Sequence, residues 1–250
     1  MQQYKTLALQ LIRQYPNVHY PLKESKGSSH YYVTRMVGTG QDVIDIGCGE
    51  GYLAVELKKF GHNRITGIDV LPTASETSSL DEYYSADLDN GISSVIRQLQ
   101  GRRFTRAILL DVLEHLKKPE TLLDECRQVL ERDGQLIISV PNIANIAVRL
   151  SLLFGQFNYT ERGLLDKTHL RFFTRKTARK MVESRGYEIL EEQMTVIPVE
   201  LIFKMPAKSL LMRSLNAVVR MLTSMAPSLF GYQIMFVACA TDLSLSRRTE

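Results

Sequence analysis

The alternation of apolar and polar positions changes period several times between residues 37 and 141. Short apolar runs rich in β-branched residues, typical of buried strands, occur in DVIDIG, RITGIDV, YYSADLD, FTRAILLDVL and GQLIISVPN. Between them the apolar residues take helical spacing, in GYLAVELKKFG, SSVIRQLQ and PETLLDECRQVLERDG, and the last of these helices is expected to end at Gly134. Strands that alternate with helices at this rhythm predict βαβ units and therefore an α/β fold with a parallel sheet.

The alternation of strand and helix patterns does not extend to the two ends of the chain. At the N-terminus, residues 4–15 and the stretch YYVTRMV predict two helices, which form a helical cap over 1–36. The remaining residues, 37–250, form one α/β domain whose late strands lie in EILEEQMTVIPVEL and GYQIMFVACA. Two insertions, at about 143–175 and 196–230, interrupt its second half and are expected to cover a ligand.

Composition excludes several classes of protein. With 250 residues, 44% hydrophobic and 23% charged, the chain suits one globular domain with elaborations. Its three cysteines, Cys48, Cys126 and Cys239, have no CxxC spacing, which argues against a zinc site or a disulfide framework. The first residues do not form a signal peptide, and no run approaches the length of about 18 apolar residues that a spanning helix needs. We therefore expect a cytoplasmic protein without a bound metal.

Three glycines follow the first predicted strand, at Gly47, Gly49 and Gly51. Ligands of open parallel sheets bind beyond the carboxyl ends of strands, and glycine lets a ligand approach the backbone. The dinucleotide fingerprint has the spacing GxGxxG, whereas this loop has GxGxG and contains Glu50, which would repel a pyrophosphate. Together with Asp45, this favours a nucleoside without phosphates that carries a positive charge. The alternative is a tight turn that binds nothing.

Acidic residues end the next three strands as well. Asp69 lies 24 residues after Asp45, where a carboxylate can accept hydrogen bonds from both ribose hydroxyls. Asp87 ends the third strand, near the expected adenine, and Asp111 ends the fourth. One such residue is usually a solvated cap, but acids on four successive strand ends indicate a ligand. S-adenosylmethionine satisfies all of these constraints.

The stretches VIDIGCGEGYLAVEL, GIDV, ADLD and AILLDVLEHLKKPETLLDECRQVLERDGQLIISVPN resemble the class I S-adenosylmethionine-dependent methyltransferases, over about residues 28–195. Within that superfamily the chain is similar to the small-molecule and glycan branch that includes the ubiquinone-type O-methyltransferases and the methionine-biosynthesis W protein. The resemblance implies a doubly wound, Rossmann-like sheet of seven strands in the order 3-2-1-4-5-7-6, with strand 7 antiparallel. It also implies N-terminal helices and a lid insertion after strand 5.

The resemblance assigns parts of the cofactor to particular residues. It implies that Asp45 and the loop Gly47–Gly51 hold the methionine part, Asp69 the ribose, and Asp87 with Leu88 the adenine. The complete set that we expect to contact S-adenosylmethionine, or its product S-adenosylhomocysteine, is Asp45, Gly47, Cys48, Gly49, Gly51, Asp69, Val70, Asp87, Leu88, Asp111 and Val112.

Two histidines are candidates for the chemistry at the acceptor. Methyl transfer needs an aligned nucleophile and, for a hydroxyl, a group that removes its proton. His115 opens the loop after the fourth strand and His169 lies in the first insertion. Histidine is the side chain suited to proton transfer near neutral pH, so either could serve as the base. Structural roles stay open: Glu114 and His115 could cap the following helix or order the loop. His169 could be a lid residue bonded to Asp166 or to the backbone.

The leading hypothesis is methyl transfer to a small-molecule, glycan or lipid-linked acceptor, with oxygen favoured. The alternative is a non-catalytic partner or scaffold subunit of the same fold. A nicotinamide oxidoreductase is disfavoured by the loop spacing, and a nucleic-acid methyltransferase by the absence of a basic face. The helix over 209–225, with Arg213 and Arg220, could lie on a membrane surface. Packing on the sheet or in a homo-oligomer is the favoured interpretation of that helix.

Overall fold

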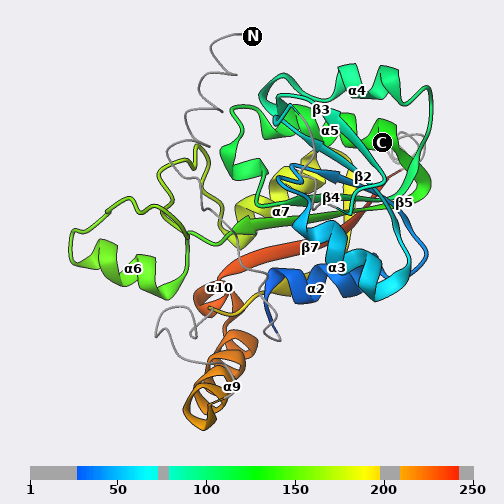
Figure 1. Ribbon diagram of the computed structural model, residues 1–250. Helices are drawn as coiled ribbons and strands as arrows, with labels where there is room; N and C mark the ends of the chain where they lie inside the picture. The colour runs from blue at the N-terminus through cyan, green and yellow to red at the C-terminus, as the bar shows by residue number, and fades with distance from the viewer. Residues whose placement is uncertain (1–26, 73–78, 198–208, 242–250) are drawn as a thin grey trace, which may run out of the picture.

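The computed structural model describes residues 27–72, 79–197 and 209–241. The helix predicted over 4–15 lies outside these residues, as do most of the cap and the part of the second insertion at 198–208. One sheet of seven strands organises the described chain (Figure 1). The strands are β1 (Asp42–Ile46), β2 (Arg64–Asp69), β3 (Glu82–Ser85), β4 (Phe104–Leu110), β5 (Leu130–Pro141), β6 (Tyr187–Met194) and β7 (Gln233–Ala240).

The sheet has the order β3-β2-β1-β4-β5-β7-β6, which confirms the predicted topology. β1 to β5 run parallel to one another, and β7 is antiparallel to both β5 and β6. β1 lies between β2 and β4, so that Asp45 pairs with Gly67 of β2 on one side and with Ile108 of β4 on the other. The strand order reverses between β1 and β4, and this is where open sheets of this kind bind ligands.

Helices cover both faces of the sheet. On one face lie α2 (Ser29–Val37) and α3 (Tyr52–Gly61), and on the other lie α4 (Ser93–Gln98), α5 (Pro119–Val129) and α7 (Arg175–Ser184) (Figure 1). Successive side chains of a strand point to opposite faces. In β4, Ile108 accordingly packs with α2 and α3, whereas Leu109 packs with α4, α5 and α7. The two faces thus form two separate apolar cores.

The helix between β4 and β5 ends earlier than its sequence predicts. α5 stops at Val129, and the segment expected to remain helical as far as Gly134 already belongs to β5. Leu130 is 2% exposed and pairs with Phe104 of β4, and its carbonyl accepts a hydrogen bond from Arg103. Burial and strand pairing at Leu130 therefore override the helical propensity of the charged residues that follow it.

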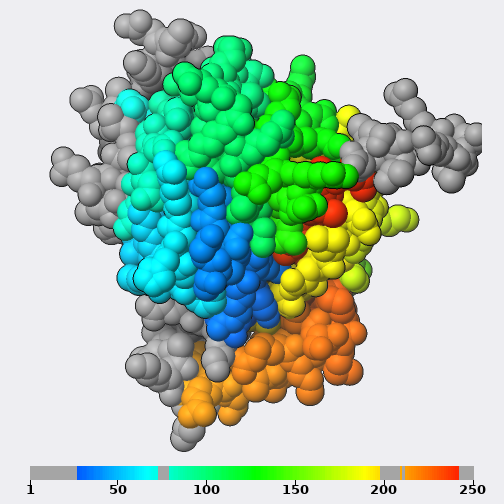
Figure 2. All heavy atoms as spheres, turned by 90° about the vertical axis from the view of Figure 1, so that its right-hand side faces the viewer, coloured from blue at the N-terminus to red at the C-terminus, as the bar shows by residue number. Residues whose placement is uncertain are grey.

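Two helical segments extend beyond the sheet. The first insertion carries α6 (Ile146–Leu153), which stands at the outer edge of the molecule (Figure 1). The second carries α9 (Leu210–Met225) and α10 (Pro227–Phe230), which lie next to α2 in the space-filling view (Figure 2). Within the described ranges, no helix combines the length and apolarity needed to cross a membrane. The compartment in which the protein works stays a prediction, and so do the domain boundaries.

Candidate cofactor and catalytic site

The glycine loop connects β1 to α3 and contains the residues with the most restricted backbone. Gly47, Gly49 and Gly51 have φ of +84°, +53° and +78°, a region that favours glycine. A Cβ at Gly47 would lie 2.5 Å from Cγ2 of Val112 and 3.7 Å from Cδ1 of Leu88, whereas one at Gly49 would meet nothing within 4 Å. The loop therefore packs closely against its neighbours at Gly47 and is open at Gly49.

Two carboxylates lie beside this loop. The backbone N–H of Gly49 donates to Oδ2 of Asp69 over 2.8 Å, and the N–H of Leu71 donates to Oδ1 of the same residue. Asp45 is 3% exposed, and burial together with the nearby charge of Asp69 raises its pKa to about 7. The same burial and the same two carboxylates raise the pKa of the Cys48 thiol, which stays protonated. A cation bound here would relieve the repulsion between Asp45 and Asp69.

These observations agree with the chemistry of S-adenosylmethionine, which has an ammonium and a sulfonium but no phosphate. Leu88 and Val112, on either side of Gly47, are apolar and come from the ends of β3 and β4. Val70, next to Asp69, is 44% exposed. The carboxylate of Asp87 caps the short helix that follows it, accepting from the N–H of Asp89 over 3.0 Å and from the side chain of Asn90. The contacts predicted for all of these residues stay predictions.

Asp111 begins the loop after β4. Its φ is +54°, a strained value for aspartate, and its carboxylate accepts from Oγ of Ser139 over 2.6 Å. The side-chain amide of Gln233 donates to both carboxylate oxygens, at 2.6 and 2.7 Å. β5 and β7 therefore fix the orientation of Asp111, and its predicted contact with the cofactor stays a prediction.

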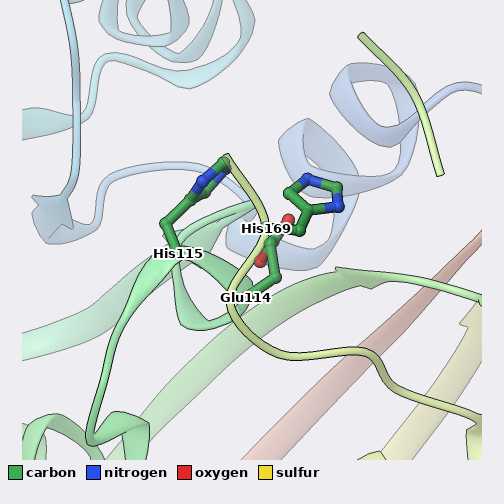
Figure 3. A group of neighbouring side chains, drawn as sticks. All are labelled: Glu114, His115 and His169. Carbon is green, nitrogen blue, oxygen red and sulfur yellow. The ribbon is translucent and has the colours of Figure 1, made fainter. Parts of the chain in front are cut away.

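The two candidate histidines lie side by side, although 54 positions separate them in the sequence (Figure 3). Their ring centroids are 4.9 Å apart and the rings meet edge to face. Glu114 and His115 belong to the turn after β4, and His169 comes from the first insertion. Backbone hydrogen bonds connect the two segments, because the N–H groups of Leu170 and Arg171 both donate to the carbonyl of Glu114.

Burial governs the protonation of this cluster. Glu114 is 1% exposed, and both of its carboxylate oxygens lack a hydrogen-bond partner, as does Nδ1 of His169. Desolvation raises the pKa of Glu114 well above its ordinary value, with a smaller contribution from Asp111. Desolvation and the neighbouring His115 lower the pKa of His169. His169 is therefore neutral at neutral pH and can accept a proton.

The structure also bears on the structural roles left open for these residues. α5 has Lys118 as its N-cap and no side-chain cap, so capping by Glu114 and His115 is excluded. His115 does order the insertion, because its Nδ1 lies 3.2 Å from both the hydroxyl and the carbonyl oxygen of Thr168. The backbone N–H of His169 donates to the carbonyl of Asp166 over 3.1 Å. The imidazole of His169 also forms a hydrogen bond with the backbone of Leu164. Both contacts fit a lid histidine bonded to the backbone, and the role of His169 as a base stays a prediction.

The same three side chains have the composition of a metal site. Glu114, His115 and His169 each offer one ligand atom, and these atoms lie within 4.8 Å of one another. One carboxylate and two imidazoles suit a divalent cation. The expectation that the protein binds no metal stays a prediction, and the experiment below includes a test of it.

The family of the chain follows from its sequence as a whole. Residues 14–192 match the family described as "Methyltransferase domain". The chain belongs to the methyltransferase domain family. Its resemblance to the class I S-adenosylmethionine-dependent methyltransferases is thereby confirmed, together with the cofactor class.

Curated relatives are similar over the same region. The mitochondrial ubiquinone biosynthesis O-methyltransferase of Homo sapiens is 26% identical over 158 residues, which cover 60% of this chain and 42% of the relative. The ubiquinone biosynthesis O-methyltransferase of Xanthomonas euvesicatoria pv. vesicatoria is 28% identical over 142 residues, covering 56% of this chain and 58% of the relative. The chain thus spans about half the length of the curated relatives it matches.

Solved structures share the fold at low identity. The 1,6-didemethyltoxoflavin-N1-methyltransferase of Burkholderia thailandensis, solved with S-adenosylhomocysteine, has a TM-score of 0.58 and 14% identity, covering 96% of this chain and 90% of that one. The N-methyltransferase NodS of Bradyrhizobium japonicum, also solved with S-adenosylhomocysteine, has a TM-score of 0.54 and 14% identity, covering 93% and 98%. These matches confirm the Rossmann-like methyltransferase fold.

Three residues near the site were missed by the sequence interpretation. Gln233 orients Asp111, as described above. Tyr232 lies beside Asp111, which together with burial raises the pKa of its phenol, and its hydroxyl approaches Gly163 of the insertion. Asn145 is fully buried and caps α6. Tyr232 and Asn145 come from segments far from the glycine loop in the sequence, and no local pattern marks them.

Proposed function

We propose that this protein transfers a methyl group from S-adenosylmethionine to a hydroxyl oxygen of a small-molecule, glycan or lipid-linked acceptor. The main support for the proposal is that the loop after β4 contacts both the glycine loop and His169. Val112 of that loop touches the glycine loop, and His115, three residues later, touches His169. The predicted cofactor residues and a neutral histidine base are thus joined by one short segment. The ubiquinone biosynthesis relatives are named O-methyltransferases, which favours oxygen as the acceptor atom.

The cofactor half of the proposal rests on electrostatics. When bound, S-adenosylmethionine supplies the electrophilic methyl group. Asp45 faces its positively charged methionine part, Asp69 accepts from its ribose hydroxyls, and the open side of Gly49 admits its chain to the backbone. Val112 and Leu88 supply apolar contacts for the nucleoside. None of these residues takes part in bond making, and their role is to bind and align the reactants.

The acceptor half assigns a proton transfer to His169. Because burial lowers its pKa, the imidazole is unprotonated at neutral pH and takes the proton of the acceptor hydroxyl as the oxygen attacks. Glu114 is a positioning residue: it lies within the cluster, and its carboxyl group is turned toward His169 (Figure 3). His115 fixes the insertion through Thr168 and thereby places His169 over the site.

A methyl-transfer assay with labelled S-adenosylmethionine and a panel of phenolic and sugar hydroxyl acceptors tests the proposal. His169→Ala should lower kcat by roughly 10²-fold or more, the usual contribution of a general base, and leave the affinity for S-adenosylhomocysteine unchanged. The matched control is His62→Asn, because His62 is an exposed histidine at the end of α3, with a φ of +54° that asparagine tolerates. Equal activity of His169→Ala and the wild type would contradict the assignment.

The pH profile and a chelator distinguish a base from a metal ligand. With a lowered pKa, His169 should keep kcat at saturating S-adenosylmethionine constant from neutral pH down to below pH ~6.5, the ordinary value, before activity falls. The same assay is run with EDTA and then with added Mg²⁺ or Zn²⁺. Activity that disappears with EDTA and returns with the ion would assign His115 and His169 as ligands and overturn the role of His169 as base.

A further inference from the structure

The segment around α6 exposes an unusual number of large apolar side chains. Within α6 itself, Val148 alone is buried. Six neighbouring side chains between 40% and 75% exposed make up what we call the α6 patch: Leu150, Leu152, Leu153, Phe154, Phe157 and Tyr159. The helix stands at the outer edge of the molecule, away from the sheet (Figure 1). Contiguous exposed apolar surface of this kind marks a site of interaction.

The charges around the α6 patch are positive. Residues 143–160 contain a single charged residue, Arg149, and no acid. Over 146–172 four basic residues stand against two acids, Glu161 and Asp166, which gives a net charge of +2. Asp166 is buried and its carboxylate accepts from Thr168, so the charge presented outward is more positive than this sum. Lys167 pairs with Glu161. The excess positive charge is therefore that of the arginines, Arg149, Arg162 and Arg171. An apolar patch with aromatic residues, flanked by arginines, is complementary to an anionic lipid surface.

The α6 patch is continuous with the candidate catalytic site. The ring of Phe157 lies 6.0 Å from that of Phe172, which lies 6.3 Å from the ring of His169. Phe172 and Leu170 also line a groove of about 490 Å³ between the insertion and the helices α5 and α7. A patch inserted at the level of the lipid headgroups would therefore bring the histidine pair to the membrane surface.

We propose that the α6 patch docks this protein on an anionic lipid bilayer, from which a lipid-linked acceptor reaches His169. The inference rests on the proposed function for the identity of the acceptor, whereas docking itself does not depend on catalysis. It differs from membrane contact through α9, whose exposed residues Val218, Met221 and Met225 form a separate surface.

Vesicle co-sedimentation of the full chain tests docking without any activity measurement. Vesicles of phosphatidylcholine alone are compared with an equal mixture of phosphatidylcholine and phosphatidylglycerol. The wild type should bind the anionic vesicles, and the double variant Leu153→Asp/Phe154→Asp should lose at least about tenfold in affinity, because two large side chains no longer enter the apolar layer. Phe60→Asp, at a 44% exposed aromatic on α3, is the matched control and should bind as the wild type does.

Three results would overturn the proposal. The wild type could fail to bind the anionic vesicles, or binding could survive in the α6 variant and disappear in Met221→Asp/Met225→Asp. The third is a wild type that sediments as a dimer, binds no vesicles and becomes monomeric on Leu153→Asp/Phe154→Asp, which would make the patch an interface between two copies. S-adenosylhomocysteine binding by each variant shows that it is folded. Failure of methyl transfer with intact vesicle binding would refute the proposed function and not the docking.

Discussion

At the scale of single residues, the most informative group is Asp45, a buried carboxyl with a pKa of about 7 against an ordinary 3.8. Between these two values the folded protein without cofactor binds more protons than the unfolded chain. Its free energy of unfolding therefore falls as the pH rises from about 4 to about 7. A bound cation favours the ionised carboxylate of Asp45 and therefore reverses this preference of the folded protein for the protonated form.

Asp45→Asn should remove this dependence. We expect the variant without cofactor to be more stable than the wild type at pH 8 by up to about 4 kcal/mol, which is a shift of about three pKa units at ~1.4 kcal/mol each. At pH 4 the difference should vanish. Urea unfolding across this pH range measures it, and parallel stability profiles of the two proteins would contradict the protonation assigned to Asp45.

A second prediction at this scale concerns the close approach at Gly47. Gly47→Ala places a Cβ 2.5 Å from Val112 at a φ of +84°, so it should weaken S-adenosylhomocysteine binding by about tenfold or more and destabilise the fold. Gly101→Ala is a matched control, because Gly101 has a φ of +86° but its Cβ would meet nothing within 4 Å. Calorimetric titration of both variants separates the clash from backbone strain. Equal losses of S-adenosylhomocysteine affinity in the two variants would show that the contact with Val112 is unimportant.

At the scale of elements, hydrogen bonds attach the start of the first insertion to α10 and to a residue that connects α10 to β7. Asn145 accepts from the N–H of Ala147 and donates to the carbonyls of Phe230 and Gly231, and Asn142 donates to the carbonyls of Ser228 and Gly231. Two buried amides thus join the start of the insertion to the last turn before β7. The start of the insertion is thereby fixed relative to β7.

Asn145→Ala should lower the free energy of unfolding by roughly 2–4 kcal/mol, the sum of a lost helix cap and unsatisfied buried carbonyls. It should also lower kcat more than it changes the affinity for S-adenosylhomocysteine, because the insertion is displaced and the glycine loop is not. Thermal unfolding and the methyl-transfer assay measure the two effects. Asn158→Ala, in the exposed part of the insertion, is the control. A variant with unchanged stability would contradict the structural role of Asn145.

The helices and strands of the structure show which elements could be predicted from the sequence. Apolar runs in the sequence marked β1, β2, β4 and β5, because buried parallel strands have nearly unbroken apolar runs. The end of α5 was misplaced because pairing of Leu130 with Phe104 is a tertiary contact with no local signal. For the same reason the sequence marked His115 and His169 as separate candidates, and their contact became visible only with the fold.

At the scale of the whole molecule, the sheet brings the ends of β1, β2 and β4 to one edge. Asp45, Asp69 and Val112 converge there with the glycine loop, and the insertion adds the histidines from outside the sheet. The cofactor half could be predicted from the spacing of strand-end acids, since the topology of the fold dictates their convergence. On the acceptor side the sequence could only name His115 and His169 as candidates, because their contact joins the loop after β4 to the insertion and has no local signal.

The measurement that tests the account most directly is isothermal titration of the purified protein with S-adenosylhomocysteine, alongside Asp69→Ala. The account predicts binding by the wild type and a loss of at least about tenfold in the variant, because Asp69 contacts the glycine loop and is expected to accept from the ribose hydroxyls. Unfolding curves of both proteins show whether the variant keeps its fold. No binding by a folded wild type would contradict the cofactor assignment and with it the proposed methyl transfer.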